Sequence, residues 1–212
     1  GLKPNLYSVN HSLFGRSPEE GTMLLKRFAT GLAVLAALLT TALPATAADQ
    51  ADPEAFYTLP AFGDFQTNLQ DALDQGKKGI LLYFFQDQCP FCQKMQKEVF
   101  TQPIVHDFFH KYFDVYKVNI KGNKKFTDVD GDRVSQVKFA VQNRARATPT
   151  LIIYGKGGKE LVRFISNPST EEFLAMGKFV VDGRYKEGVD FFNYKRKEAQ
   201  SGIREEIRDK YL

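Results

Sequence analysis

The sequence contains two cysteines, three positions apart in the segment Cys89-Pro90-Phe91-Cys92. A disulfide that closes so small a loop removes little chain entropy from the unfolded state, so it would be a weak structural staple. Two thiols at this spacing are better suited to exchanging a disulfide with another molecule. We therefore predict that Cys89 and Cys92 form a redox-active pair, with Pro90 and Phe91 as the active-site spacer.

The neighbouring elements are expected to position and activate this pair. The apolar run 79–85 predicts a buried strand, and the apolar spacing within 93–111 predicts a long helix, kinked or interrupted near Pro103. Unpaired amides and the positive end of the helix dipole stabilise a thiolate at a helix start. We therefore expect Cys89 to be the acidic, nucleophilic cysteine, and Cys92 to resolve the mixed disulfide that Cys89 forms.

Two histidines, His106 and His110, lie four positions apart in the same predicted helix. With the cysteines they could bind a metal, as in exported copper carriers, although those carriers space their cysteines by three residues. A zinc site usually has four ligands, and the sequence has no second cysteine pair. We interpret the histidines as a solvated helix face, and we predict no metal and no cofactor besides the redox-active disulfide.

The rest of the chain predicts an alternation of helices and strands. Helices are expected at 65–75, at 134–143 and after the capping-box pattern at 169–172; strands are expected at 113–120 and as a hairpin over 150–165. The polar segment 121–133 is interpreted as a loop insertion, and 195–212 as a solvated helix. The order predicts an α/β fold with three layers, α/β/α, around a central mixed sheet, plus an N-terminal helix and a C-terminal helical extension.

The segment 23–47 has the pattern of a secretory signal peptide. Lys26 and Arg27 precede an apolar run, and small residues follow it up to Ala47. We predict cleavage near Ala47 and a periplasmic or otherwise extracytoplasmic location; a retained membrane anchor is the alternative. Residues 1–22 are predicted not to belong to the mature protein, and 48–212 to form a single domain.

The charge balance excludes one class of partner. Four of the 29 Lys and Arg residues and two of the 25 Asp and Glu residues lie within 1–47, which leaves 25 cations and 23 anions in the predicted mature protein. Its net charge is therefore close to zero, and the sequence shows no basic stripe with interleaved aromatic residues. We predict no nucleic-acid partner.

The segment from about 79 to 181 resembles a thioredoxin-fold domain. The resemblance rests on a strand, a Cys-x-x-Cys at the next helix start, a strand ending Lys117-Val-Asn-Ile, and Thr148-Pro149-Thr opening a later strand. It implies that Pro149 is cis and lies against the cysteines. It also implies that Thr148 forms backbone hydrogen bonds with a bound substrate chain.

More closely, the pattern is similar to exported thioredoxins of the SoxW-like kind. This resemblance implies that the protein reduces disulfides. We predict that its substrates are exported proteins or small thiol or disulfide molecules, that a membrane thiol donor reduces it again, and that it is a monomer. One position departs from the thioredoxin pattern, because Tyr83 stands where the family has a buried aspartate that relays protons. Tyr83 and Lys117, which matches the lysine beside that aspartate, are the candidate proton-transfer neighbours.

The predicted function is therefore an exported thiol-disulfide oxidoreductase, working as a protein-disulfide reductase. One alternative is a disulfide-forming oxidase of the same fold, which runs the same steps in reverse. Another is a non-catalytic thioredoxin-like module that binds a partner or carries a metal. The extension 182–212 has no role assigned by the sequence.

Overall fold

The computed structural model of the chain describes residues 50–59 and 61–212. The predicted upstream segment 1–22 and the predicted signal peptide 23–47 lie outside these residues. All the described residues fall within one compact unit. No helix in the described part of the chain is long and apolar enough to cross a membrane.

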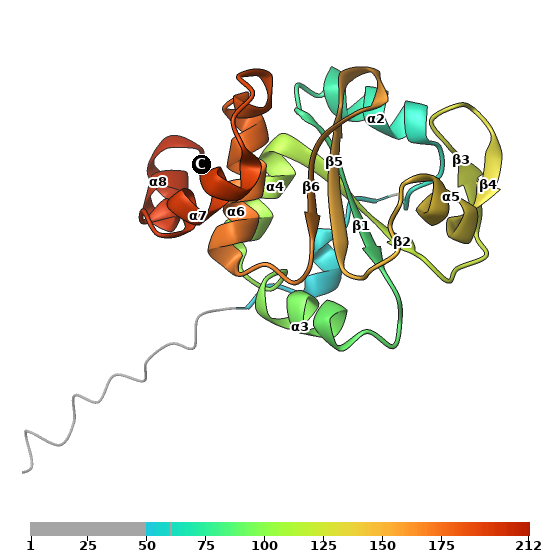
Figure 1. Cartoon of the computed structure of the whole chain (residues 1–212), viewed down its shortest axis with the longest axis horizontal. Coiled ribbons are helices and arrows are strands. Elements are labelled where there is room, and N and C mark those ends of the chain that lie inside the picture. Colours follow the sequence, from blue (N-terminus) through green and yellow to red (C-terminus); the bar gives the residue numbers. More distant parts are fainter. Residues whose placement is uncertain (1–49, 60) are drawn as a thin grey trace, which may run out of the picture. The chain divides into compact units, whose positions relative to one another are not determined.

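A four-stranded mixed sheet forms the middle of the fold (Figure 1). Its strands stand in the order β2 (Phe113–Asn119), β1 (Gly79–Phe85), β5 (Thr150–Gly155), β6 (Lys159–Ile165). Strand β1 is parallel to β2 and antiparallel to β5, and β5 is antiparallel to β6. The two central strands are almost entirely buried, because their apolar runs face helices on both sides.

Helices cover both faces of the sheet, as Figure 1 shows. One face carries α3 (Pro90–Glu98), α4 (Pro103–Tyr112) and α6 (Thr170–Val181); the other carries α2 (Phe65–Asp74), α5 (Gln136–Gln142) and a two-stranded sheet of β3 (Lys125–Thr127) and β4 (Arg133–Ser135). Each face has its own cluster of buried apolar side chains. The predicted three-layer α/β/α fold is confirmed.

The regions 93–111 and 121–133 differ in how closely they follow the sequence pattern. The helix expected over 93–111 is interrupted as predicted: α3 ends at Glu98, and α4 begins with Pro103 as its first residue. The segment 121–133 is more than a loop, because it contains β3 and the start of β4. These short strands bury only Phe126 and Val134, which is too little apolar patterning to stand out in the sequence.

The prediction of a solvated helix over 195–212 was wrong. The C-terminal extension consists of a short 3₁₀ turn, η3 (Arg184–Lys186), and two helices, α7 (Phe191–Ala199) and α8 (Ile203–Lys210). Ile203 and Ile207, four positions apart, are buried against the same core as α6. The charged residues around them conceal this narrow apolar stripe in the sequence.

A segment before α2 also packs on the fold. The short 3₁₀ helix η1 (Pro53–Phe56) begins with Asp52 as its N-cap, and Phe56 is fully buried. After η1, the Thr58 amide donates to the Val115 carbonyl at 2.8 Å, and the Val115 amide donates to the Thr58 hydroxyl at 2.9 Å. We call residues 52–58 the N-terminal segment.

Candidate active site

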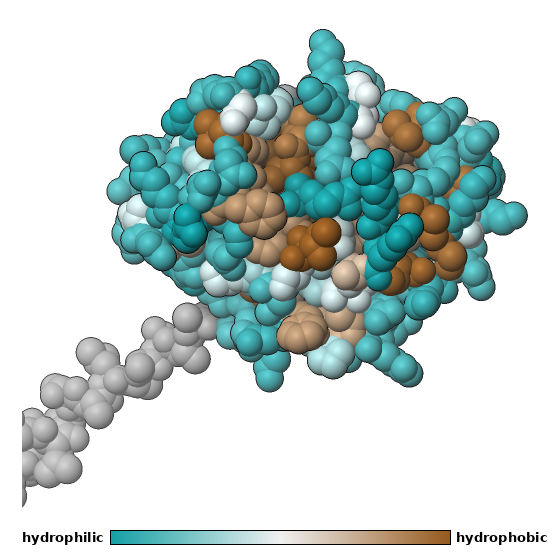
Figure 2. All heavy atoms as spheres, viewed as in Figure 1, coloured by the Kyte–Doolittle hydropathy of each residue, from teal (hydrophilic) through white to brown (hydrophobic). Residues whose placement is uncertain are grey.

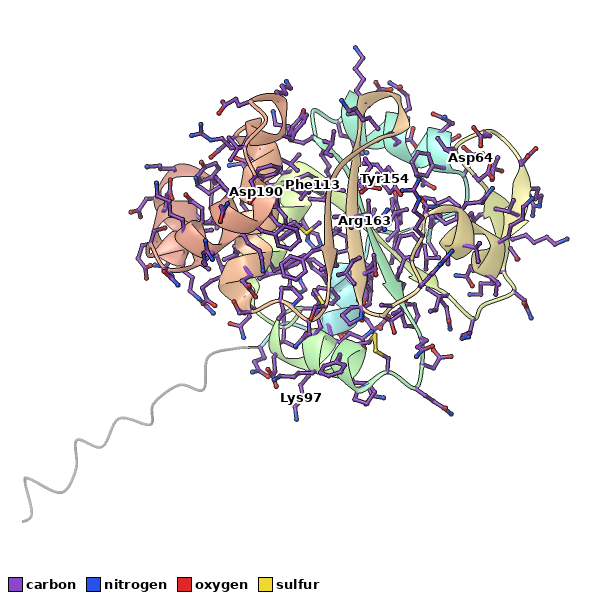
Figure 3. All side chains as sticks on the ribbon, in the orientation of Figure 1. Asp64, Lys97, Phe113, Tyr154, Arg163 and Asp190 are labelled. Atoms are coloured by element: carbon purple, nitrogen blue, oxygen red, sulfur yellow. A yellow bond between two sulfur atoms is a disulfide. The ribbon has the colours of Figure 1, made fainter. Side chains whose placement is uncertain are left out.

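The two cysteines lie at the start of α3 and are joined by a disulfide (Figure 3). Cys89 is the N-cap residue of the helix, with an extended backbone, and Pro90 is the first residue of α3. Proline fits this position because its missing N–H would have no partner within the helix. The turn of helix brings the Cys92 amide within 3.1 Å of Cys89 Sγ, where it donates a hydrogen bond.

The loop between β1 and α3 is held by polar contacts. The Asn119 side-chain amide donates to the Asp87 carboxylate at 3.1 Å, and the Gln93 side-chain amide donates to the Asp87 carbonyl at 3.3 Å. Asn119 ends β2 and Gln93 lies in α3, so both neighbouring elements fix the loop that leads into Cys89.

Thr148, the residue before Pro149, lies in contact with Cys89. The Thr148–Pro149 peptide bond is cis. The Thr148 hydroxyl donates to Cys89 Sγ at 3.3 Å, and the Thr148 carbonyl oxygen lies 3.5 Å from the same sulfur atom. The Pro149 carbonyl accepts from the Ser166 amide, which ties this turn to the end of β6. The substrate-contact role of Thr148 stays a prediction.

Exposed apolar side chains accompany the redox pair. Both cysteines are buried, with Cys92 only 1% exposed, whereas the spacer residue Phe91 is 64% exposed. Figure 2 shows apolar surface over α3 on the face that it draws. Ile165, the last residue of β6, is 54% exposed and is the strand partner of Thr150, the residue after Pro149.

Tyr83 lies on β1, beneath the side of α3 that faces the sheet. It is fully buried, and its hydroxyl donates to the Cys92 carbonyl at 3.4 Å. Its ring stacks on those of Phe85 and Tyr57, with centroids 5.6 and 6.3 Å away. Burial raises the pKa of the Tyr83 phenol well above its ordinary value, so the side chain stays neutral near neutral pH.

Lys117 is the strand partner of Tyr83, on β2. Its ammonium nitrogen does not bond to Tyr83 but forms an ion pair with Glu54 Oε2, at 2.5 Å, and lies 4.5 Å from the centre of the Tyr57 ring. The Tyr57 hydroxyl accepts from the Gln96 side-chain amide at 3.5 Å. Two residues of the N-terminal segment therefore contact side chains next to the redox pair: Glu54 pairs with Lys117, and Tyr57 contacts Tyr83 and Gln96.

The sequence and its geometry place this chain among known proteins. A family model described as a thioredoxin-like domain matches residues 65–180, which is more than half of the chain. The chain belongs to the thioredoxin-like family. Cys89, Cys92, Thr148 and Pro149 lie within the matched residues of the thioredoxin-like domain, whereas the N-terminal segment lies outside them. No curated protein matches the sequence.

Among the solved structures that resemble this chain, one with a TM-score above 0.5 shares its fold. A thioredoxin-fold protein from Helicobacter pylori is 20% identical, with a TM-score of 0.58, over 75% of this chain and 98% of that one. A thioredoxin from Thermus thermophilus is 25% identical, with a TM-score of 0.46, over 60% of this chain and 93% of that one. A DsbH oxidoreductase is 21% identical, with a TM-score of 0.41, over 57% and 81%.

The two histidines of α4 serve packing in this thioredoxin-like domain, and the prediction of a solvated face was wrong. His106 is buried and its Nε2 bonds to the Phe100 carbonyl; His110 Nε2 bonds to the Phe56 carbonyl at 3.1 Å. The two rings hold η1 on α4, because Phe56 packs against both of them. Within 50–59 and 61–212 no group of three metal-ligating side chains comes together.

Sequence reasoning missed Glu54 and Tyr57 as neighbours of the redox pair. They precede the cysteines by more than thirty positions and belong to a segment with no clear period. The one available signal is Lys117, a cation near the end of a buried strand, because such a residue generally needs a carboxylate partner.

Proposed function

We propose that this protein is an exported thiol-disulfide oxidoreductase that reduces disulfides in other exported proteins. The observation that carries the proposal is the disulfide at the start of α3, with Cys89 Sγ in contact with the Thr148 hydroxyl. Two hydrogen-bond donors, that hydroxyl and the Cys92 amide, point at Cys89 Sγ. They would stabilise a thiolate there once the disulfide is reduced.

The proposed cycle has two exchanges. The Cys89 thiolate attacks a substrate disulfide, which forms a mixed disulfide and releases one substrate sulfur as a thiolate. Cys92 then loses its thiol proton and attacks Cys89 Sγ, which releases the second substrate sulfur and forms the Cys89–Cys92 disulfide. A membrane thiol donor returns both electrons, and no cofactor other than the dithiol takes part.

The surroundings of the pair favour a protein substrate. Phe91 and Ile165 offer exposed apolar contacts near the cysteines. An extended substrate chain could place a disulfide at Cys89 and form backbone hydrogen bonds at Thr148, whose carbonyl lies close to the sulfur. We base the reductive direction on the SoxW-like resemblance. We base the extracytoplasmic location, after cleavage near Ala47, on the leader pattern of 23–47. We also propose that the protein works as a monomer.

Covalent trapping tests the mechanism. Cys92→Ser removes the resolving thiol, so we expect the variant to accumulate mixed disulfides with exported proteins, which non-reducing electrophoresis detects as heavier species. Cys89→Ser is the matched control and should trap nothing. If Cys92→Ser traps no protein when it is exported in living cells, the proposed cycle is wrong. A pure binding module would instead retain its partner in the Cys89→Ser variant.

The direction of exchange follows from the reduction potential of the pair. Titration of the mature protein against glutathione or dithiothreitol measures it. A value near about −270 mV, that of thioredoxin, would support a reductase. A value near about −120 mV, that of the oxidant DsbA, would establish the disulfide-forming alternative and overturn the proposed direction.

A further inference from the structure

Two non-glycine residues in the described part of the chain have a positive φ, and both adjoin the Thr148–Pro149 turn. Arg144 has a φ of 54°, and Ser166 has a φ of 126°. The Ser166 amide donates to the Pro149 carbonyl, and Arg144 precedes Thr148 by four positions. A side chain makes this backbone region unfavourable, and residues that are kept in it cluster at functional sites. Their placement points to a role for the segment that leads into the turn.

Arg144 ends α5 at a position where glycine is favoured. It follows Asn143, the C-cap of the helix, and its amide donates to the Val141 carbonyl at 3.0 Å. The Ala145 amide donates to the Ala140 carbonyl at 2.8 Å. These two bonds form a Schellman motif, whose left-handed residue is usually glycine because a Cβ is unfavourable there. An arginine costs stability at this position, which indicates that its side chain serves a purpose other than ending the helix.

Hydrogen bonds fix the backbone of the loop between α5 and β5. The Tyr154 hydroxyl donates to the Asn143 side chain, and the Arg163 guanidinium donates to the Asn143 carbonyl at 2.9 Å. Nearer to β5, the Thr150 hydroxyl donates to the Ala147 carbonyl at 2.7 Å. Side chains on this loop therefore start from a fixed place, which lowers the entropy lost when they bind a ligand.

This loop carries two exposed cations, Arg144 and Arg146, beside the redox pair. It lies at the end of the sheet where α3 begins (Figure 1). Arg146 is two positions before Thr148, so their Cα atoms are at most about 7 Å apart. The Thr148 hydroxyl in turn contacts Cys89 Sγ. A substrate chain bound at Thr148 would therefore pass close to both guanidinium groups.

The surface around the two arginines has an excess of positive charge. The segment 121–146 contains seven cations and three anions, although the charges of the predicted mature chain nearly balance. None of these seven cations forms an ion pair within residues 50–59 and 61–212. One of the anions, Asp128, is buried and bonded to backbone amides. An anionic chain that approaches the redox pair from this side would be attracted.

We propose that Arg144 and Arg146 bind carboxylates next to the disulfide of a protein substrate, so that disulfides in acidic segments are reduced in preference to neutral ones. The proposal rests on the proposed function, because it names the substrate class of that exchange. Arginine suits this task, since its planar guanidinium can bond to a carboxylate at two points. The two residues determine specificity and take no part in the electron transfer.

Reduction of two matched peptides tests the proposal. Each peptide has one internal disulfide, with glutamates beside its cysteines in one peptide and glutamines in the other. Reduced protein gives two electrons to the peptide disulfide, which becomes two thiols, while the Cys89–Cys92 disulfide forms. Acid quenching and chromatography measure the rate, relative to reduction of the same peptide by dithiothreitol. We expect the acidic peptide to react about fivefold faster at low salt, with a smaller preference at high salt.

Variants assign the preference to the two arginines. The double variant Arg144→Gln, Arg146→Gln should reduce the acidic peptide no faster than the neutral one. Arg144→Gly should lose part of the preference yet unfold at the same or a higher denaturant concentration, because glycine fits the left-handed backbone. Arg208→Gln is the matched control: it removes one exposed cation from α8, in the C-terminal extension, and should keep the preference.

The outcomes separate this proposal from the proposed function. If the parent protein reduces both peptides equally well, the proposed exchange stands and the role of the arginines is wrong. If the double variant slows both peptides by the same factor, the arginines have a structural role, which also overturns the proposal. If the protein reduces neither peptide, the proposed function fails together with the specificity that rests on it.

Discussion

At the scale of single residues, the sulfur of Cys89 is the atom on which the local contacts converge. The Cys92 amide approaches it from the first turn of α3, and the Thr148 hydroxyl approaches it from the turn before β5. In the disulfide these are weak contacts, because a half-cystine sulfur carries no charge. In the reduced protein both donors would point at a thiolate, and hydrogen bonds to charged groups are the stronger kind.

Removal of the Thr148 hydroxyl should make Cys89 less acidic. We expect Thr148→Val, which keeps the shape of the side chain, to raise the pKa of the Cys89 thiol by about 0.5–1 pH unit, since one donor to the thiolate is lost. The pH dependence of alkylation by iodoacetamide measures this pKa. Thr150→Val is the control, because that hydroxyl donates to the Ala147 carbonyl and not to sulfur. An unchanged Cys89 pKa in Thr148→Val would show that the hydroxyl does not bond to the thiolate.

The redox pair itself could be predicted from the sequence, whereas its inner neighbours could not. Cys89 and Cys92 are identified by residue type and local spacing, which the sequence displays directly, and Pro149 by the resemblance to thioredoxins. Glu54 pairs with Lys117, and Tyr57 stacks on Tyr83, because η1 packs on the distant helix α4 through Phe56. Contacts of this kind follow from tertiary packing and leave no local pattern.

At the scale of elements, a buried lysine fastens the C-terminal helices to α6. The ammonium nitrogen of Lys178 lies 2.9 Å from Asp182, 3.2 Å from Glu198 on α7 and 3.6 Å from Glu206 on α8. Burial opposes its charge, but the hydrogen bonds to Asp182 and Tyr194 outweigh burial and raise the Lys178 pKa. A raised pKa means that this contribution to stability is complete at neutral pH and is lost only in strong alkali, above the usual lysine range.

Loss of this cation should loosen α7 and α8. We expect Lys178→Met to lower the free energy of unfolding by about 3 kcal/mol, because three carboxylates then face one another without a counter-charge. Amide hydrogen exchange should accelerate in α7 and α8 while the central strands stay protected. The control is Lys210→Met, an exposed partner of Glu206, which should cost less than about 1 kcal/mol. Unchanged exchange in both helices of Lys178→Met would contradict this role.

The elements that were predicted well from the sequence are those with long runs of apolar residues. The strands 79–85 and 113–120 and the hairpin over 150–165 match β1, β2, β5 and β6 closely, because their apolar runs are long. The extension was interpreted wrongly because the burial of α8 depends on two isoleucines among charged neighbours. Two isoleucines on one face of a helix become buried only if another apolar surface lies against them. That surface is provided here by the core that includes α6, and the sequence of the extension does not show it.

At the scale of the whole molecule, stability in acid depends on a buried carboxylate. Asp128, in the turn between β3 and β4, accepts hydrogen bonds from the amides of Asp130 and Asp132 and from the Gln142 side chain. Burial opposes its charge, but these bonds outweigh burial and hold the Asp128 pKa below its ordinary value of 3.8. Its contribution is therefore present above about pH 4 and is lost as the pH falls towards the pKa in the folded state.

Substitution of this carboxylate should change how the free energy of unfolding depends on pH in the acid range. We expect Asp128→Asn to unfold at lower denaturant concentration at pH 7, by about 1–2 kcal/mol in the free energy of unfolding. The difference from the wild type should shrink below pH 4, since the wild-type carboxylate is then being protonated. Denaturant titrations from pH 2 to pH 7 measure both. Asp130→Asn, at an exposed position, is the control; a constant difference at all pH values would contradict the link to protonation.

The hydrogen bonds between Thr58 and Val115 cover part of one outer edge of the sheet. Strand β2 is an outer strand of the sheet, and an outer strand with free amides and carbonyls can recruit a strand from another molecule. Thr58 occupies both backbone groups of Val115. On the opposite outer strand, β6, the charged side chains of Glu160 and Arg163 form a two-point ion pair. Charged side chains on an outer strand oppose pairing with a strand of another molecule. A shortened form that lacks the N-terminal segment would therefore expose unpaired backbone groups on β2. We expect it to aggregate at concentrations at which the intact protein stays in solution.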